Sequence, residues 1–187
     1  MRMRRSCILM LAVVMLACVT AAQAQGRYGI GRPATPAEIA GWNIDIDRHG
    51  HNLPPGSGSV SHGREVFAQQ CAACHGAKGE GGIGEQLVGG QGTLATPEPV
   101  KTVGSYWPYA PTLFDYIRRA MPQNAPESLS NDDVYAVSAY ILSLNGLLSP
   151  DAILDARTLS GVKMPNRKMF VDDPRPDVKN STCMVHC

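Results

Sequence analysis

Apolar residues recur at helical spacing in a stretch that starts at Ser61. Phe67, Cys71 and Cys74 lie at i, i+4 and i+7, so this spacing puts them on one face of a predicted helix. A shorter amphipathic stretch at 111–120 predicts another helix. Its inward-facing positions are Leu113, Ile117 and Ala120.

The strongest helix signal follows Ser130, which is a good N-cap residue. Asp132 and Asp133 stand in the first turn, where negative charge suits the helix dipole, and Gly146 is placed to end the helix. One apolar face follows from the spacing of Val134, Val137, Ile141 and Leu144. These patterns predict an all-α fold.

The segments between and around these helices have a different composition. Residues 76–111 are rich in glycine and proline, and a loop of that length inside a compact domain suggests that it wraps a bound cofactor. Residues 25–59 read as an extended N-terminal arm with one capped helical turn at 35–42. A domain at 60–148 is followed by an extension, 149–187, which begins with a helical turn at 150–159 and ends in a tail rich in Pro and Asp.

The first 24 residues are typical of a secretory signal peptide. They combine a basic start, an uncharged apolar run at 7–20 and a small-x-small cleavage site that ends at Ala24. Lipidation at Cys18 is the alternative to this cleavage, because residues 16–18 loosely resemble a lipoprotein box. We therefore expect a periplasmic protein, without a membrane span after residue 25 because no long apolar run follows it.

Removing the signal peptide changes the charge balance. The whole sequence has 17 basic and 16 acidic residues, and the signal carries three arginines and no acid, so 14 basic and 16 acidic residues remain, a net charge of −2. No basic stripe is present, which argues against nucleic acid as a partner. The cysteines after residue 24 are Cys71, Cys74, Cys183 and Cys187.

The motif Cys71-Ala72-Ala73-Cys74-His75 carries the clearest chemistry. Two thiols at this spacing can each bond one vinyl group of a porphyrin, and the next residue then directs its imidazole at the iron. A redox dithiol would need a βαβ context, and a zinc site would need a second suitably spaced ligand pair. The sequence shows neither, so we expect one covalently bound haem c, with His75 as an iron ligand.

The sixth iron ligand is predicted to be Met121, which follows a short helix and precedes Pro122. His/Met ligation raises the reduction potential and closes the iron to substrate, which favours one-electron transfer. The other candidates are Met164, the weaker Met169 and Met184, and the histidines His49, His51 and His62. An exchangeable sixth ligand would instead indicate a haem enzyme or a redox sensor.

Two further groups of residues have open roles. Tyr106, Trp107 and Tyr109 cluster before the helix that leads to Met121, and their polar tips are candidates for hydrogen bonds with haem propionates, ordinary packing being the alternative. Arg118 and Arg119 are suited to propionates, to an acidic partner or to a solvated helix face.

The cysteine pair near the C-terminus calls for its own explanation. Cys183 and Cys187 are expected to form a local disulfide, since free thiols are unusual in an exported protein. A metal site that includes His186 is the weaker alternative.

Several of these residues together resemble a class I cytochrome c, over residues 60–146. They are Gly63, Phe67, the motif 71–75, Met121-Pro122 and Ala139-Tyr140-Ile141. The resemblance implies an all-α fold around one haem, with Gly63 and Phe67 facing Tyr140 where the first and last helices cross.

A closer resemblance covers nearly all of the chain after the signal peptide. Segments 35–42, 53–58, 87–94, 104–110 and 163–167 and the ending with its two cysteines are similar to the C-terminal half of the cytochrome subunit of sulfane dehydrogenase, in the thiosulfate-oxidising Sox system. That family's cytochrome has two haems, and this sequence has one attachment motif.

This closer resemblance implies a partner. A molybdenum-cofactor subunit of the sulfite-oxidase type, in a sulfane or sulfite dehydrogenase or a related molybdoenzyme, would donate electrons. A respiratory cytochrome c or an oxidase would accept them. The protein itself would be the electron-transfer subunit and not the enzyme.

Overall fold

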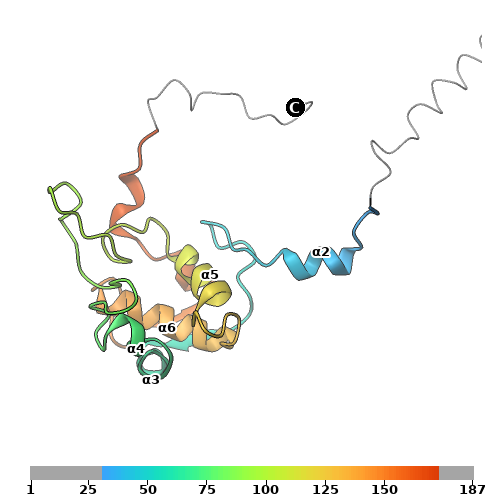
Figure 1. Cartoon of the computed structure of the whole chain (residues 1–187), viewed down its shortest axis with the longest axis horizontal. Helices are drawn as coiled ribbons and strands as arrows, with labels where there is room; N and C mark the ends of the chain where they lie inside the picture. Colours follow the sequence, from blue (N-terminus) through green and yellow to red (C-terminus); the bar gives the residue numbers. More distant parts are fainter. Residues whose placement is uncertain (1–30, 173–187) are drawn as a thin grey trace, which may run out of the picture. The chain divides into compact units, whose positions relative to one another are not determined.

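The computed structural model describes residues 31–172, which belong to two units that divide after Asn43 (Figure 1). The first unit contains α2 (Pro36–Trp42), the capped helical turn that the sequence predicts. Thr35 and Glu38 form a capping box, and Arg32 pairs with Glu38 at 2.6 Å. The helix buries none of its residues, so its ends rather than a core stabilise it within this unit.

The second unit begins at Ile44 and is mostly helical. Its elements in order are β1 (Ser57–Ser59), α3 (Val60–Gln70), α4 (Ala72–His75), α5 (Ala110–Ala120), α6 (Asn131–Leu144), β2 (Ile153–Asp155), α7 (Ala156–Ser160) and the 3₁₀ helix η1 (Pro165–Lys168). The two strands pair antiparallel, with Gly58 opposite Leu154. This small sheet corrects the all-α prediction, and the expected helical turn at 150–159 is in part the strand β2.

Helices α3 and α6 lie against each other at the bottom of Figure 1, and a glycine makes their contact close. A Cβ on Gly63 would stand 1.9 Å from the carbonyl oxygen of Ala136 and 2.9 Å from Cβ of Tyr140. The Phe67 and Tyr140 rings meet edge to face at 5.4 Å between centroids. The expected contact of Gly63 and Phe67 with Tyr140 is therefore confirmed.

The predicted helix from Ser61 to Cys74 is interrupted. Cys71 has φ −122° and ψ −37°, outside the helical region, so α3 ends at Gln70 and α4 starts at Ala72. Phe67 is buried and Cys71 is half-buried, whereas Cys74 is exposed. The predicted single helix is therefore two helices, and the three side chains differ in burial.

The other two predicted helices are confirmed. α5 begins one residue earlier than expected and buries Leu113 and Ile117. In α6, the Ser130 hydroxyl accepts the backbone N–H of Asp133 at 3.1 Å, and the face containing Val134 and Ile141 is buried.

Residues on both sides of 60–148 contribute to the core of this unit. Ile46, Leu154 and Leu159 are buried with Phe67 and Phe114 in one apolar cluster. The boundaries of the haem domain stay a prediction. The predicted signal peptide and the predicted disulfide between Cys183 and Cys187 lie outside residues 31–172 and also stay predictions. Within those residues, no helix has the length and apolar character that crossing a membrane requires.

Candidate haem site

The haem-attachment motif straddles the break between two helices. Cys71 stands at the junction of α3 and α4, and His75 is the last residue of α4. The Cys71 carbonyl accepts the backbone N–H groups of Cys74 (3.1 Å) and His75 (3.0 Å), which fixes the spacing of the motif. Before haem is attached, burial, with a smaller contribution from Cys74, raises the pKa of the Cys71 thiol to about 11.

A hydrogen bond sets the orientation of the His75 ring. Its Nδ1 lies 2.6 Å from the carbonyl oxygen of Glu85. A carbonyl only accepts, so Nδ1 carries the proton and the lone pair of Nε2 is left for a metal. The donor set and this tautomer both fit a haem iron bound through Nε2 of His75.

The loop that follows α4 folds back onto the motif through backbone hydrogen bonds. Gly81 N–H donates to the carbonyl of His75 and Gly84 N–H to that of Cys74, each at 2.8 Å. A Cβ on Gly84 would stand 3.0 Å from both Cε1 and Nδ1 of His75. The approach of this loop to the imidazole therefore favours a residue without a side chain.

A buried asparagine fastens the next part of the loop to α6. Asn145 donates from Nδ2 to the carbonyl of Leu87 at 3.1 Å, and its Oδ1 accepts the N–H of Gly89 at 3.0 Å. A Cβ on Gly104 would stand 2.0 Å from that Oδ1, so the loop passes the asparagine at two places. Sequence reasoning missed Asn145, because its position after the last helix carries no sign of these partners.

Thr102 and Ser105 tie together the end of the same loop. Both are buried, and the Thr102 hydroxyl donates to the carbonyl of Gly89 at 2.6 Å. The Ser105 hydroxyl donates to the carbonyl of Val100 at 2.7 Å. Side-chain hydrogen bonds thus replace regular secondary structure between α4 and α5.

Met121, the predicted sixth ligand, is the C-cap residue of α5 and is half-buried. It packs against the apolar core, at whose edge the half-buried side chains of Cys71, Leu87 and Trp107 also lie. The thioether and the first cysteine of the motif thus both pack against this core, and both are partly exposed.

The alternative ligands have other surroundings. Met164 is a core residue with 4% exposure, whereas Met169 is 72% exposed. His62 contacts Asp133 at 2.8 Å and His51 contacts Asp47 at 2.7 Å, and both histidines are exposed, as is His49. Met184 lies outside the described residues. Among the described candidates, Met121 is the half-buried one.

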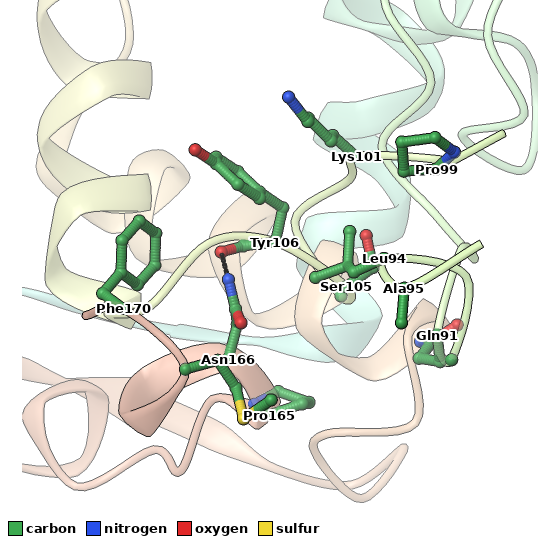
Figure 2. A pocket seen from close by; sticks show the side chains of 13 residues that line it. Gln91, Leu94, Ala95, Pro99, Lys101, Ser105, Tyr106, Pro165, Asn166 and Phe170 are labelled. Atoms are coloured by element: carbon green, nitrogen blue, oxygen red, sulfur yellow. Dashed lines mark hydrogen bonds between the residues drawn. The ribbon is translucent and has the colours of Figure 1, made fainter. Parts of the chain in front are cut away.

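The aromatic candidates for propionate contacts, Tyr106 and Trp107, face different surroundings. Trp107 is half-buried and meets Tyr116 edge to face at 5.8 Å. Tyr106 lines an open hollow of about 730 Å³ and lies there beside Asn166 and Phe170 (Figure 2). There its backbone carbonyl accepts a hydrogen bond from Asn166 Nδ2 at 2.5 Å.

The arginines that the sequence offered for propionates have partners within the protein. Arg119 forms an ion pair with the buried Asp115, and Arg118 donates to the carbonyl of Ile44 at 3.3 Å. Asp115 also accepts the N–H of Ile46 at 2.9 Å. These two arginines and Asp115 therefore anchor the start of the second unit to α5.

Comparison with known proteins identifies relatives of this chain by sequence and by structure. Residues 58–141 match the family model described as cytochrome C oxidase, cbb3-type, subunit III. A chain in the crystal structure of the sulfane dehydrogenase SoxCD from Paracoccus pantotrophus is 42% identical, with a TM-score of 0.75. The match covers 86% of this chain and 82% of that one.

A curated relative is more distant. The thiosulfate dehydrogenase of Stutzerimonas stutzeri (strain A1501) is 33% identical over 93 residues, which are 48% of this chain. The matched part is 29% of the relative, so this chain spans less than a third of that protein.

The fold, the attachment motif and the family model define a c-type cytochrome, a class whose haem c is covalently bound. Within this class, the chain belongs to the family of the SoxCD chain that it matches. The predicted relation to sulfane dehydrogenase and the predicted cofactor are thereby confirmed. The relation supports an electron-transfer role.

Proposed function

We propose that the protein is a one-electron carrier whose haem is attached through Cys71 and Cys74 and ligated by His75 and Met121. The single observation that carries this proposal is the 2.6 Å hydrogen bond from His75 Nδ1 to the Glu85 carbonyl. Because Nδ1 holds the proton in this bond, the lone pair of Nε2 is available to bind the iron. When bound, haem c supplies an iron that gains or loses one electron. The sequence contains one Cys-x-x-Cys-His motif, so we propose one haem for this chain.

Met121 closes the second face of the iron in this proposal. Its backbone N–H donates to the Ile117 carbonyl at 3.0 Å, so the end of α5 fixes the residue, and the buried Pro122 follows it. The backbone of Met121 is therefore already ordered, so binding the iron costs mainly the side-chain entropy of the methionine. Such a site favours an iron whose sixth coordination position is permanently occupied by Met121 over one whose sixth position is open to substrate.

The electron donor in this proposal is a molybdenum-cofactor dehydrogenase that oxidises sulfite or sulfane sulfur. The 42% identity with a chain of the sulfane dehydrogenase SoxCD supports this class of partner. The acceptor would be a respiratory cytochrome c or oxidase. The signal-like residues 1–24 support a periplasmic location, and the proposed pair Cys183–Cys187 suits that oxidising compartment.

A haem enzyme is the second candidate, because the curated relative is named a thiosulfate dehydrogenase. Such an enzyme needs a sixth iron position that substrate can reach. The two functions therefore differ in one property of Met121, which is whether it leaves the iron.

Carbon monoxide binding to the purified ferrous protein separates the two candidates. We expect the wild type and a Met164→Leu control to bind it poorly and Met121→Ala to bind it readily, because only the last change opens the iron. The ferric wild type should also show the weak far-red charge-transfer band of Met ligation, which Met121→Ala should abolish. Ready binding by the wild type, without that band, would favour the enzyme.

A further inference from the structure

Two arginines converge on one tyrosine at the beginning of α5. Tyr109 is the N-cap residue of this helix and is half-buried. The guanidinium carbon of Arg48 lies 6.0 Å from the centroid of its ring and that of Arg167 lies 5.5 Å from it. The two arginines belong to segments on opposite sides of the predicted domain 60–148, so the fold brings them together.

Neither guanidinium has a carboxylate partner among residues 31–172. Arg32 and Arg119 show the usual alternative, since each pairs with a carboxylate within its own unit. Arg48 donates from Nε to His49 Nε2 at 3.1 Å, a bond that leaves its two terminal nitrogens. Two cations near one half-buried ring repel each other, so this arrangement fits bound anionic groups that pair with them.

The segment that carries Arg48 is held by hydrogen bonds. The buried Asp115 accepts the N–H of Ile46, and the Asp47 carboxylate accepts the N–H groups of His49 (2.8 Å) and His51 (3.0 Å). Arg48 therefore extends from a turn that is fixed on both of its sides.

The segment that carries Arg167 is fixed in a comparable way. Its neighbour Asn166 is buried, with 5% exposure, and donates to the Tyr106 carbonyl, as the dashed line in Figure 2 shows. This bond ties η1 to the stretch that ends at Tyr109. Both arginines thus arrive at the tyrosine on anchored backbone, as a preorganised binding site requires.

The tyrosine and the proposed sixth ligand, Met121, are the two cap residues of α5. Trp107, two residues before Tyr109, packs against the same apolar core as Met121 and Cys71. The anionic groups of a c-type haem are its two propionates. We propose that Arg48 and Arg167 bind these propionates across the face of Tyr109, an inference that rests on the haem position given under the proposed function.

This clamp has an electrostatic consequence. A guanidinium near the haem disfavours the ferric state, which carries one more positive charge than the ferrous state. Arg48 and Arg167 therefore raise the midpoint potential. Arginine suits the role because its planar fork binds a carboxylate through two hydrogen bonds and stacks on an aromatic ring.

The midpoint potential of the purified holoprotein tests the clamp. We compare Arg48→Gln, Arg167→Gln and the double variant with Arg157→Gln, which removes an equal charge from an exposed position in α7. We expect each single change to lower the potential several-fold more than the control does. The double change should lower it further, and Arg48→Lys and Arg167→Lys should each keep most of the wild-type potential.

The outcomes separate the clamp from the proposed function. If both Gln variants shift the potential no more than Arg157→Gln does, while the wild type keeps the far-red band of Met ligation, the clamp is wrong and the electron-transfer proposal stands. If the wild type lacks that band, the ligand assignment fails whatever the arginines do. The Lys variants preserve charge and much of the side chain, so they keep the test decisive if a Gln variant does not fold.

Discussion

The crossing of α3 and α6 and the segment 76–109 are stabilised by different interactions. The crossing is dry and apolar, with Phe67 and Ala136 buried and the backbones in contact at Gly63. The segment 76–109 has no helix or strand within it, and side-chain hydrogen bonds from Asn145 and Thr102 hold it. Close packing therefore specifies the first region, and individual polar contacts specify the second.

The two regions should therefore depend on the haem to different degrees for their stability. Ordering a long irregular segment costs backbone entropy at every residue, and few buried apolar side chains offset that cost here. Part of the compensation comes from the fixed contacts of Asn145 and of His75 with Glu85. We infer that the bound haem supplies the remainder, so this segment should respond to loss of haem more than the crossing does.

Gly63→Val should have the largest effect on stability. The added Cβ would overlap the Ala136 carbonyl oxygen and force α3 away from α6. We expect the free energy of unfolding to fall by about 3 kcal/mol or more, measured by urea denaturation of the holoprotein. Ala68→Val, at an exposed position of the same helix, is the control and should cost less than about 1 kcal/mol. Equal losses in the two variants would show that the crossing is not tightly packed.

Asn145→Leu tests the region that polar contacts hold. The change keeps the side-chain size and leaves the Leu87 carbonyl and the Gly89 N–H without their partner. We expect a loss of roughly 2 kcal/mol, with hydrogen exchange faster at 86–91 than in α6. Equal acceleration in α6 would contradict the separation of the two regions.

Gly84→Ala should affect the haem more than the stability. Its Cβ would press on the His75 ring at 3.0 Å and strain the hydrogen bond to Glu85. We expect a stability loss of only about 1 kcal/mol, with a higher midpoint potential because a strained Nδ1–H hydrogen bond makes the imidazole a weaker donor to ferric iron. Gly161→Ala is the control, since a Cβ there meets only ordinary contacts. An unchanged potential would show that the loop does not orient the ligand.

Asp133→Asn should have the smallest effect, and it should depend on pH. The Ser130 hydroxyl, and after it the side chain of His62, lowers the pKa of the Asp133 carboxyl below its usual range. The carboxylate therefore stabilises the fold above its unfolded-state pKa, and this stabilisation is lost as the pH falls below about 4.

Thermal unfolding between neutral and acidic pH measures this contribution. Asp133→Asn should remove about 0.5 kcal/mol at neutral pH and flatten the decline in acid. The control is Asp151→Asn, at an exposed position. A variant that declines in acid as steeply as the wild type would exclude this contribution.

Local signals in the sequence predicted the regular parts of the fold. The Ser130 cap and the apolar spacing of α6 are local properties, and the structure has this helix as expected. The break at Cys71 was missed because apolar periodicity continues through it. The strand at Ser57–Ser59 was missed because a Ser-Gly-Ser stretch carries no strand signal and depends on its distant partner.

The candidate site divides in the same way. The motif 71–75 and Met121-Pro122 were recognisable because their chemistry lies in adjacent residues. The contacts of Asn145 with the loop and of Arg48 and Arg167 with Tyr109 join residues that lie far apart in the sequence. Such contacts depend on the tertiary packing, so no local sequence pattern predicts them.

Near-infrared magnetic circular dichroism of the ferric holoprotein tests the central claim most directly, because its charge-transfer band reports the pair of axial ligands. We expect histidine and methionine in the wild type, and loss of the methionine signature in Met121→Ala but not in Met164→Leu. A wild-type spectrum of histidine with water, or of two histidines, would contradict the assignment of this protein as an electron carrier with a closed iron.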